Sequence, residues 1–135
     1  MGYPIKLGVE VLLDKHIRLL KGKRVGLLTN QTGADSQLVS TIRLFHRHPS
    51  ITLTVLFAPE HGIKTAAKEG ERFSDSMHEE TGLPVYSLYG KSKKPSADML
   101  EQVDIVVFDI QDIGARYYTY IYSLAYMMQA CAEQG

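Results

Sequence analysis

Short apolar runs alternate with longer segments of a different periodicity along this chain, and this alternation most constrains its fold. Four mostly apolar runs lie at residues 24–29, 51–57, 84–88 and 104–110, each bounded by turn or charged residues. Apolar runs of this length are typical of strands that are buried on both faces of a sheet. We therefore predict four strands, of which 24–29 (RVGLLT) and 51–57 (ITLTVLF) are the first two.

The segments around these runs are predicted to be helices, at residues 9–20, 37–48, 95–102 and 115–133. Asp35 or Ser36 would cap the second helix, with Leu38, Ile42 and Phe45 facing inward. Strands separated by helices imply βαβ units with right-handed crossovers. We therefore predict an α/β fold of Rossmann-like, doubly wound type, with a mostly parallel sheet of about four strands flanked by helices. Residues 58–82 lack a periodicity, so they form a functional loop or contain a short element.

Composition excludes several classes of protein. The 135 residues suit one domain, and the 15 basic residues balance the 15 acidic ones. This balance argues against a nucleic-acid partner, which requires a basic excess. The single cysteine, Cys131, excludes an intramolecular disulfide and a cysteine-based metal cluster. The absence of an apolar run of roughly 20 residues argues against insertion into a membrane.

The extent of the chain leads to two further expectations. Residues 1–6 do not resemble a signal peptide, so the protein is cytoplasmic or has lost a leader. Parallel sheets often contain more than four strands, so residues 1–135 are expected to be one α/β domain at the amino-terminal part of a larger protein.

Polar side chains follow each predicted strand, at residues 29–33, 58–62, 89–91 and 109–116. Ligands of open α/β sheets bind at the carboxyl ends of the strands, so these segments predict a pocket. Glu60 follows the buried second strand, and burial would raise its pKa and keep it a proton donor near neutral pH. The alternative is a helix cap or an ion pair with lysine. His61 beside it is a further catalytic candidate, able to donate a hydrogen bond to a sugar or a phosphate; the alternative is a structural histidine.

The segment after the fourth strand carries four more candidates. Asp109 ends an apolar strand, where an unpaired carboxylate is costly, so an ion pair with Arg116 is expected. Gln111 and Asp112 are then the groups that face a ligand.

Neutral and aromatic groups complete the predicted pocket. Thr29 and Asn30 offer the neutral hydrogen bonds that suit a sugar. Tyr118, Tyr122 and Tyr126 would share a helical face, which is typical of a core or an interface, although Tyr118 is near enough to reach the pocket.

Metal and nucleotide sites are not indicated. The five histidines lack metal-ligand spacing, and the chain contains neither a G-x-x-x-x-G-K-[ST] loop nor a G-x-G-x-x-G turn after its first strand. We therefore predict no cofactor.

Four ordered motifs carry a resemblance to a known family. They are GKRVGLLTNQTG (22–33), FAPEHG (57–62), TGLPVYSLYG (81–90) and VFDIQDIGARYYTY (107–120). Together they resemble the NamZ-type exo-β-N-acetylmuramidases, glycoside hydrolase family 171, formerly a domain of unknown function. The resemblance covers roughly residues 8–135 and implies a Rossmann-like domain followed by a smaller one.

The resemblance also implies an activity and a location. Family members release N-acetylmuramic acid from the non-reducing ends of peptidoglycan fragments during cell-wall turnover, and many are exported to the bacterial envelope. It implies that Glu60 is the catalytic carboxylate. Glycosidases usually need a second acidic group, which would be Asp112 or Asp109 or would lie in the remaining part of the larger protein. The sugar's hydroxyl, acetamido and lactyl groups would be held by Asn30, Gln111, His61 and Arg116.

Three other interpretations remain open. The chain would be a sugar-binding module without chemistry, a glycosidase of another specificity on the same scaffold, or a structural unit that associates through an exposed sheet edge and its tyrosine-rich helix.

Overall fold

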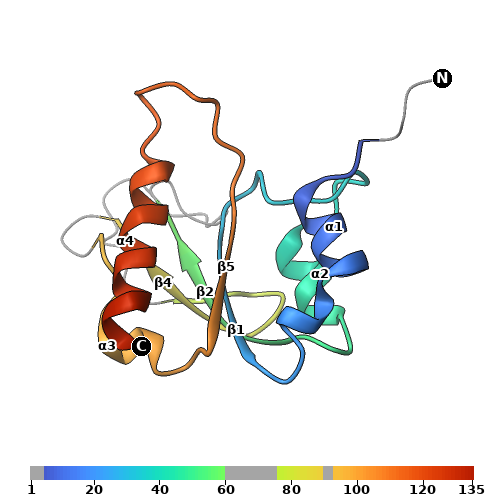
Figure 1. Cartoon of the computed structure of the whole chain (residues 1–135), viewed down its shortest axis with the longest axis horizontal. Helices are drawn as coiled ribbons and strands as arrows, with labels where there is room; N and C mark the ends of the chain where they lie inside the picture. Colours follow the sequence, from blue (N-terminus) through green and yellow to red (C-terminus); the bar gives the residue numbers. More distant parts are fainter. Residues whose placement is uncertain (1–4, 60–75, 90–92) are drawn as a thin grey trace.

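The computed structural model describes residues 5–59, 76–89 and 93–135, which form one sheet with helices on both faces (Figure 1). Within these ranges the sheet has five strands in the order β3-β4-β2-β1-β5. Their bounds are β1 (Arg24–Thr29), β2 (Thr52–Ala58), β3 (Ser76–Met77), β4 (Pro84–Ser87) and β5 (Ile105–Asp109). Neighbouring strands are parallel except for β3, which pairs antiparallel with β4. The predicted α/β class and its four strands are confirmed, and β3 is the short element within residues 58–82.

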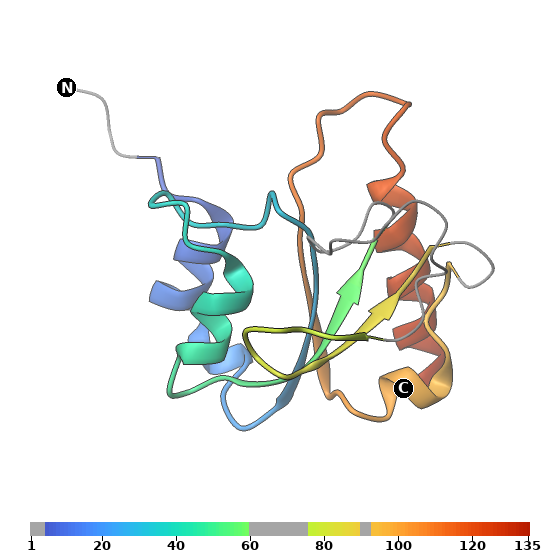
Figure 2. The same ribbon diagram turned by 180° about the vertical axis from the view of Figure 1, so that it is seen from behind.

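The helices form a layer on each side of the sheet. They are α1 (Gly8–Lys15), α2 (Thr41–Arg47), α3 (Ala97–Leu100) and α4 (Tyr120–Gln134), with a 3-10 turn at Ile17–Leu19. Helices α1 and α2 cover one face, and α3 and α4 cover the other (Figures 1 and 2). Because side chains alternate along a strand, Leu27 packs with Phe45 in the first layer while its neighbour Leu28 packs with Met127 in the second.

Helix α2 begins later than the sequence predicts. Asp35 accepts hydrogen bonds from the backbone N–H groups of Gln37 and Val39, which forms a turn in place of a cap. Leu38 then has a φ of 61° and is 87% exposed, so its predicted inward position is wrong. Ser40 is the actual cap, since its hydroxyl accepts from the backbone N–H of Arg43. The predicted burial of the two other inner residues, Ile42 and Phe45, is confirmed.

Two other helices are shorter than predicted. The first ends at Lys15 and is followed by the 3-10 turn rather than continuing to residue 20. The last begins at Tyr120 instead of 115, because Gly114, with a φ of 72°, makes a turn whose N–H is bound by the Asp112 carboxylate at 2.6 Å. Tyr118 therefore precedes the helix and does not share its face with Tyr122.

Strand order reverses at β1. The chain passes from β1 to β2 and β4 on one side, then returns through α3 to β5 on the other side of β1. The carboxyl ends of β1 and β5 therefore flank the topological switch point, where ligands of open α/β sheets bind.

An ion pair joins β1 and β5 at their opposite, amino ends. Arg24 Nη2 lies 2.9 Å from Asp104 Oδ1, and the backbone N–H of Arg24 donates to Asp104 Oδ2 at 2.8 Å. The Arg24 guanidinium and its backbone N–H together lower the pKa of Asp104 to about 2. Arg24 and Asp104 therefore satisfy each other within the fold.

Candidate functional site

Asp109 and Thr29 link the carboxyl ends of β5 and β1. The Thr29 hydroxyl donates to the backbone oxygen of Asp109 at 2.7 Å, and the Asp109 carboxylate accepts from the hydroxyl of Thr41 at the start of α2. Arg116 is not the partner of Asp109, contrary to expectation, because Thr41 is closer in the fold and satisfies the carboxylate. Thr29 and Asp109, both predicted to bind a ligand, thus use hydrogen-bonding groups to hold the two strand ends together.

Gly33 allows the β1–α2 loop to pack tightly against this junction. A Cβ added there would lie 2.1 Å from Thr29 Oγ1 and 2.8 Å from the backbone oxygen of Asp109. Contacts this short do not occur, so a side chain at this position would push the loop away from β5. Gly33 is therefore required for close approach rather than for an unusual backbone angle.

Asn30 directly follows β1 and has an oriented amide. It is 4% exposed, and its Oδ1 accepts from the backbone N–H and the hydroxyl of Thr32 at 2.9 and 2.6 Å. Because a backbone N–H can only donate, the atom facing it must be the oxygen, which fixes the orientation of the amide. Among the described residues, Asn30 Nδ2 is then a buried donor without a hydrogen-bond partner. An unsatisfied buried donor costs about 1–3 kcal/mol and calls for an explanation.

Gln111 and Asp112 extend the network from β1 to the loop after β5. The backbone N–H of Gln111 donates to the Thr32 hydroxyl at 2.8 Å, and its side chain donates to the backbone oxygen of Asp112 at 2.9 Å. These bonds connect Asn30, through Thr32, to the loop that carries Asp112 and Arg116. The structure thus brings together the candidates that follow β1 and β5.

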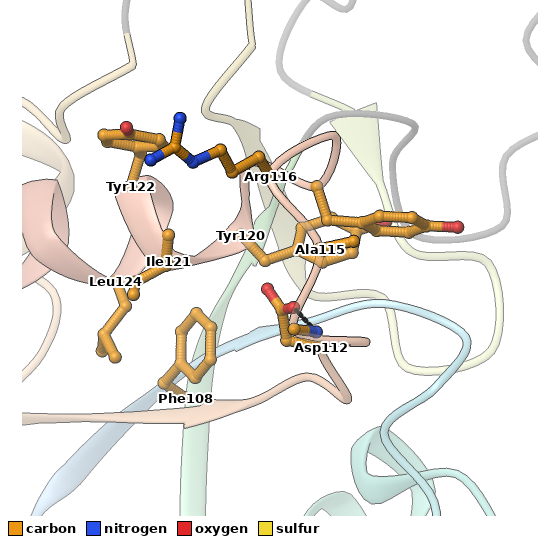
Figure 3. Close-up of a pocket in the computed structure, with 10 residues that line it drawn as sticks. Phe108, Asp112, Ala115, Arg116, Tyr120, Ile121, Tyr122 and Leu124 are labelled. Atoms are coloured by element: carbon orange, nitrogen blue, oxygen red, sulfur yellow. Dashed lines mark hydrogen bonds between the residues drawn. The ribbon is translucent and has the colours of Figure 1, made fainter.

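A pocket of about 770 Å³ lies between this loop and the start of α4 (Figure 3). Its polar side chains include Asp112 and Arg116, and the remaining lining is largely aromatic and aliphatic. Tyr118 belongs to the lining, with its ring centroid 5.8 Å from that of Tyr120. The Arg116 side chain extends toward Tyr122 and away from Asp112 in Figure 3.

Glu60 and His61 lie outside the described residues. The described chain leads to them through Pro59, which is fully buried after the end of β2. Strand β2 pairs with β1 up to Leu28 and Phe57, so the backbone leaves β2 beside the carboxyl end of β1. This is the same end of the sheet as Asn30 and Asp109.

Sequence reasoning missed three residues of this site. Thr41, Thr32 and Gly33 make or permit the contacts that join β1, α2 and β5. Thr32 and Gly33 lie in the segment 29–33 that the sequence assigns to the pocket. The hydroxyl group of Thr32 and the absence of a side chain at Gly33 could have indicated their roles. Thr41 carried no such signal, because its partner Asp109 is 68 residues away.

The described ranges contain no group of three or more His, Cys, Asp or Glu side chains placed to hold a metal ion. Within the same ranges, no helix is both long and apolar enough to cross a membrane.

An α/β domain with its polar groups gathered at the switch point is a ligand-binding or catalytic scaffold by its architecture. The family model for the amino-terminal part of the exo-β-N-acetylmuramidase NamZ matches residues 25–135, and the chain belongs to this family. The resemblance found in the four motifs is thereby confirmed.

Three relatives support this assignment. The chain is 49% identical to the peptidoglycan β-N-acetylmuramidase NamZ of Bacillus subtilis (strain 168), over 97% of this chain and 32% of that protein. A crystal structure of a DUF1343 family protein from Bacteroides fragilis NCTC 9343 has a TM-score of 0.86 and 46% identity, covering 96% of this chain and 32% of that one. A second DUF1343 protein of the same organism has a TM-score of 0.73 and 30% identity, covering 97% and 32%. The chain thus spans about a third of the length of these relatives.

Proposed function

We propose that this protein is an exo-β-N-acetylmuramidase, which releases N-acetylmuramic acid from the non-reducing ends of peptidoglycan fragments. The observation that carries the proposal is the 49% identity to a peptidoglycan β-N-acetylmuramidase, across nearly the whole of this chain. The oriented donor of Asn30 after β1 and the pocket between the loop after β5 and α4 support the proposal, because neutral donors and aromatic walls suit a sugar.

Glu60 is proposed as the general acid that protonates the glycosidic oxygen. It follows the buried Pro59 after β2, at the end of the sheet where ligands of open α/β folds bind. Glycosidases usually pair this acid with a second carboxyl group that acts as base or nucleophile. Asp112 is the better second group in the described structure, because the Asp109 carboxylate is already engaged by Thr41.

The remaining predicted residues are proposed as sugar contacts. Asn30 Nδ2 would donate to a carbonyl or hydroxyl oxygen of the sugar. Gln111 would add a contact from the loop after β5, and Tyr118 would contact the sugar from the lining of the pocket. His61 would contribute a hydrogen bond from the position after Glu60. Thr29 and Asp109 would act mainly by holding the strand ends that present these groups.

The protein's wider setting is also part of the proposal. Because the relatives are about three times as long, the chain is proposed as the amino-terminal α/β domain of a larger glycosidase, whose other part completes the cleft. A peptidoglycan substrate would place the enzyme in the bacterial cell envelope. Association between copies through the sheet edge remains a prediction.

The test is release of a chromophore from a β-linked N-acetylmuramic acid glycoside by the full-length protein. The proposal predicts release from this substrate and much slower release from the matching N-acetylglucosamine and glucose glycosides. Binding of the muramic acid glycoside without release would indicate a sugar-binding module instead. Faster release from another glycoside would indicate a glycosidase of another specificity.

A further inference from the structure

Arg116 carries the one basic group among the described residues that line the pocket. The side chain is exposed, it lines the pocket, and within the described residues it forms neither an ion pair nor a hydrogen bond to a carboxylate. Two other arginines behave differently. Arg24 donates two side-chain hydrogen bonds to the carboxylate of Asp104, and Arg43 donates two to the carboxylate of Glu80.

The surroundings of Arg116 define the ligand group that it suits. Phe108, Ile121 and Leu124 form an apolar wall, and tyrosines supply most of the remaining lining. Asp112 is the only acidic side chain among the described lining residues, and its Oδ1 accepts from the N–H of Gly114 at 2.6 Å. The Arg116 side chain extends away from Asp112 (Figure 3). The planar guanidinium of Arg116 can donate two parallel hydrogen bonds to a carboxylate, and the apolar wall beside it can contact the carbon skeleton of the same ligand.

We propose that Arg116 binds the free carboxylate of the substrate's lactyl ether and thereby selects acidic sugars over neutral ones. The inference rests on the proposed function, since it assigns a specificity-determining residue to the same site. The lactyl carboxylate distinguishes N-acetylmuramic acid from N-acetylglucosamine by charge. A bidentate pair with arginine would require both the negative charge and the planar shape of a carboxylate.

The geometry of the loop supports this assignment. Arg116 follows the Gly114 turn, which the Asp112 carboxylate stabilises, and it precedes the Tyr118 ring that packs against Tyr120. The loop also bonds to β1 through Gln111 and Thr32, so its start is tied to the end of the sheet where Asn30 lies.

The experiment crosses two enzymes with two substrates. The full-length wild type and its Arg116→Gln variant are assayed on a β-N-acetylmuramic acid glycoside and on the same glycoside with its lactyl carboxylate converted to a methylamide. We expect the wild type to prefer the acid in kcat/KM by about tenfold or more, since hydrogen bonds to charged groups are the strong ones. The variant should lose this preference through a raised KM for the acid, with little change for the amide.

Two further variants serve as controls. Lys93→Gln removes one positive charge from the neighbouring pocket at Tyr89 and Tyr126, so it should keep the wild-type preference for the acid. Arg116→Lys keeps the charge without the planar fork, so it should show an intermediate preference. It also provides the comparison if Arg116→Gln does not fold.

The outcomes separate the two proposals. An active wild type whose Arg116 variants both keep the full preference for the acid would overturn this inference and leave the proposed function standing. The same holds if Lys93→Gln abolishes the preference as completely as Arg116→Gln does, because the effect would then come from general charge. A wild type that releases neither substrate would overturn the proposed function, and the inference with it.

Discussion

The two ends of the β1–β5 pair are built from the same two strands but differ in how their polar groups are satisfied. At the amino end, Arg24 and Asp104 are paired through side chains and backbone. At the carboxyl end, neither the buried donor of Asn30 nor the guanidinium of Arg116 is paired with a described residue, and Arg116 lines a pocket. The carboxyl end also contains the neutral bonds from Thr29 and Thr41 to Asp109.

The Arg24–Asp104 pair stabilises the fold, whereas the polar groups of Asn30 and Arg116 are available to a ligand under the proposed function. An oriented buried donor without an acceptor calls for an explanation, and the proposed function supplies one in a sugar oxygen that would bind Asn30 Nδ2. The internal bonds of Asp109 serve to hold that donor and the loop after β5 in place. At the amino end, the pairing of Arg24 with Asp104 needs no ligand to explain it.

The largest stability effect is expected from Gly33→Ala. The new Cβ would meet the backbone oxygen of Asp109 at 2.8 Å, and a backbone atom cannot rotate away as a side chain can. We expect a loss of about 3 kcal/mol in the free energy of unfolding, measured by urea denaturation of the full-length protein.

Gly8→Ala is the matched control for this substitution. A Cβ at Gly8, the first residue of α1, would meet no atom within 4 Å. It should be neutral or stabilise by up to about 1 kcal/mol, since alanine favours a helix. A Gly33→Ala protein as stable as Gly8→Ala would show that the carboxyl-end junction is looser than described.

A smaller effect is expected from Thr41→Val. The substitution keeps the shape of a fully buried side chain but removes the hydroxyl that donates to the Asp109 carboxylate. Hydrogen bonds to charged groups contribute about 1.5–3 kcal/mol, so we expect a loss in that range by urea denaturation. Thr41→Ser retains the hydroxyl and should recover part of the loss; equal losses in both variants would argue that packing, and not this bond, is what matters.

The smallest effect is expected from Asp104→Asn at the amino end, because the ion pair is half-exposed and screened by water. Hydrogen bonds from Arg24 lower the pKa of Asp104 from 3.8 to about 2. The folded state therefore favours the ionised form, and this contribution is present above pH 4 and lost as the pH falls toward 2. Thermal melts should show the variant less stable at pH 6 and equal to wild type near pH 2. A difference that stays constant over this range would contradict the assignment.

Most of the fold could be predicted because it follows from local patterns. The apolar runs predict β1, β2, β4 and β5, since a buried strand leaves a continuous apolar segment in the sequence. The start of α2 could not be predicted, because Asp35 stabilises a turn as readily as it caps a helix. The late start of α4 has a similar cause in the turn at Gly114.

The site could be located from the sequence more readily than its contacts could. Strand ends mark the carboxyl edge of the sheet, so Thr29, Asn30 and Asp109 were correctly expected to lie at one place. The predicted partner of Asp109 was wrong. Arg116 was chosen because it is near Asp109 in the sequence, whereas the fold brings the hydroxyl of Thr41 to the Asp109 carboxylate. Long-range partners of this kind depend on how α2 packs on the sheet, which local pattern does not encode.

The central claim, that the chemistry lies at the carboxyl end of the sheet, is tested most directly by Glu60→Gln in the full-length protein. Its control is Glu101→Gln, at the amino end, where only the backbone oxygen of Glu101 contacts Arg24. The measurement is kcat for release from a β-N-acetylmuramic acid glycoside, with folding checked by circular dichroism. We predict a fall of about 10²- to 10⁴-fold for Glu60→Gln, the usual contribution of a general acid, and wild-type turnover for Glu101→Gln. Wild-type turnover by a folded Glu60→Gln protein would contradict the account.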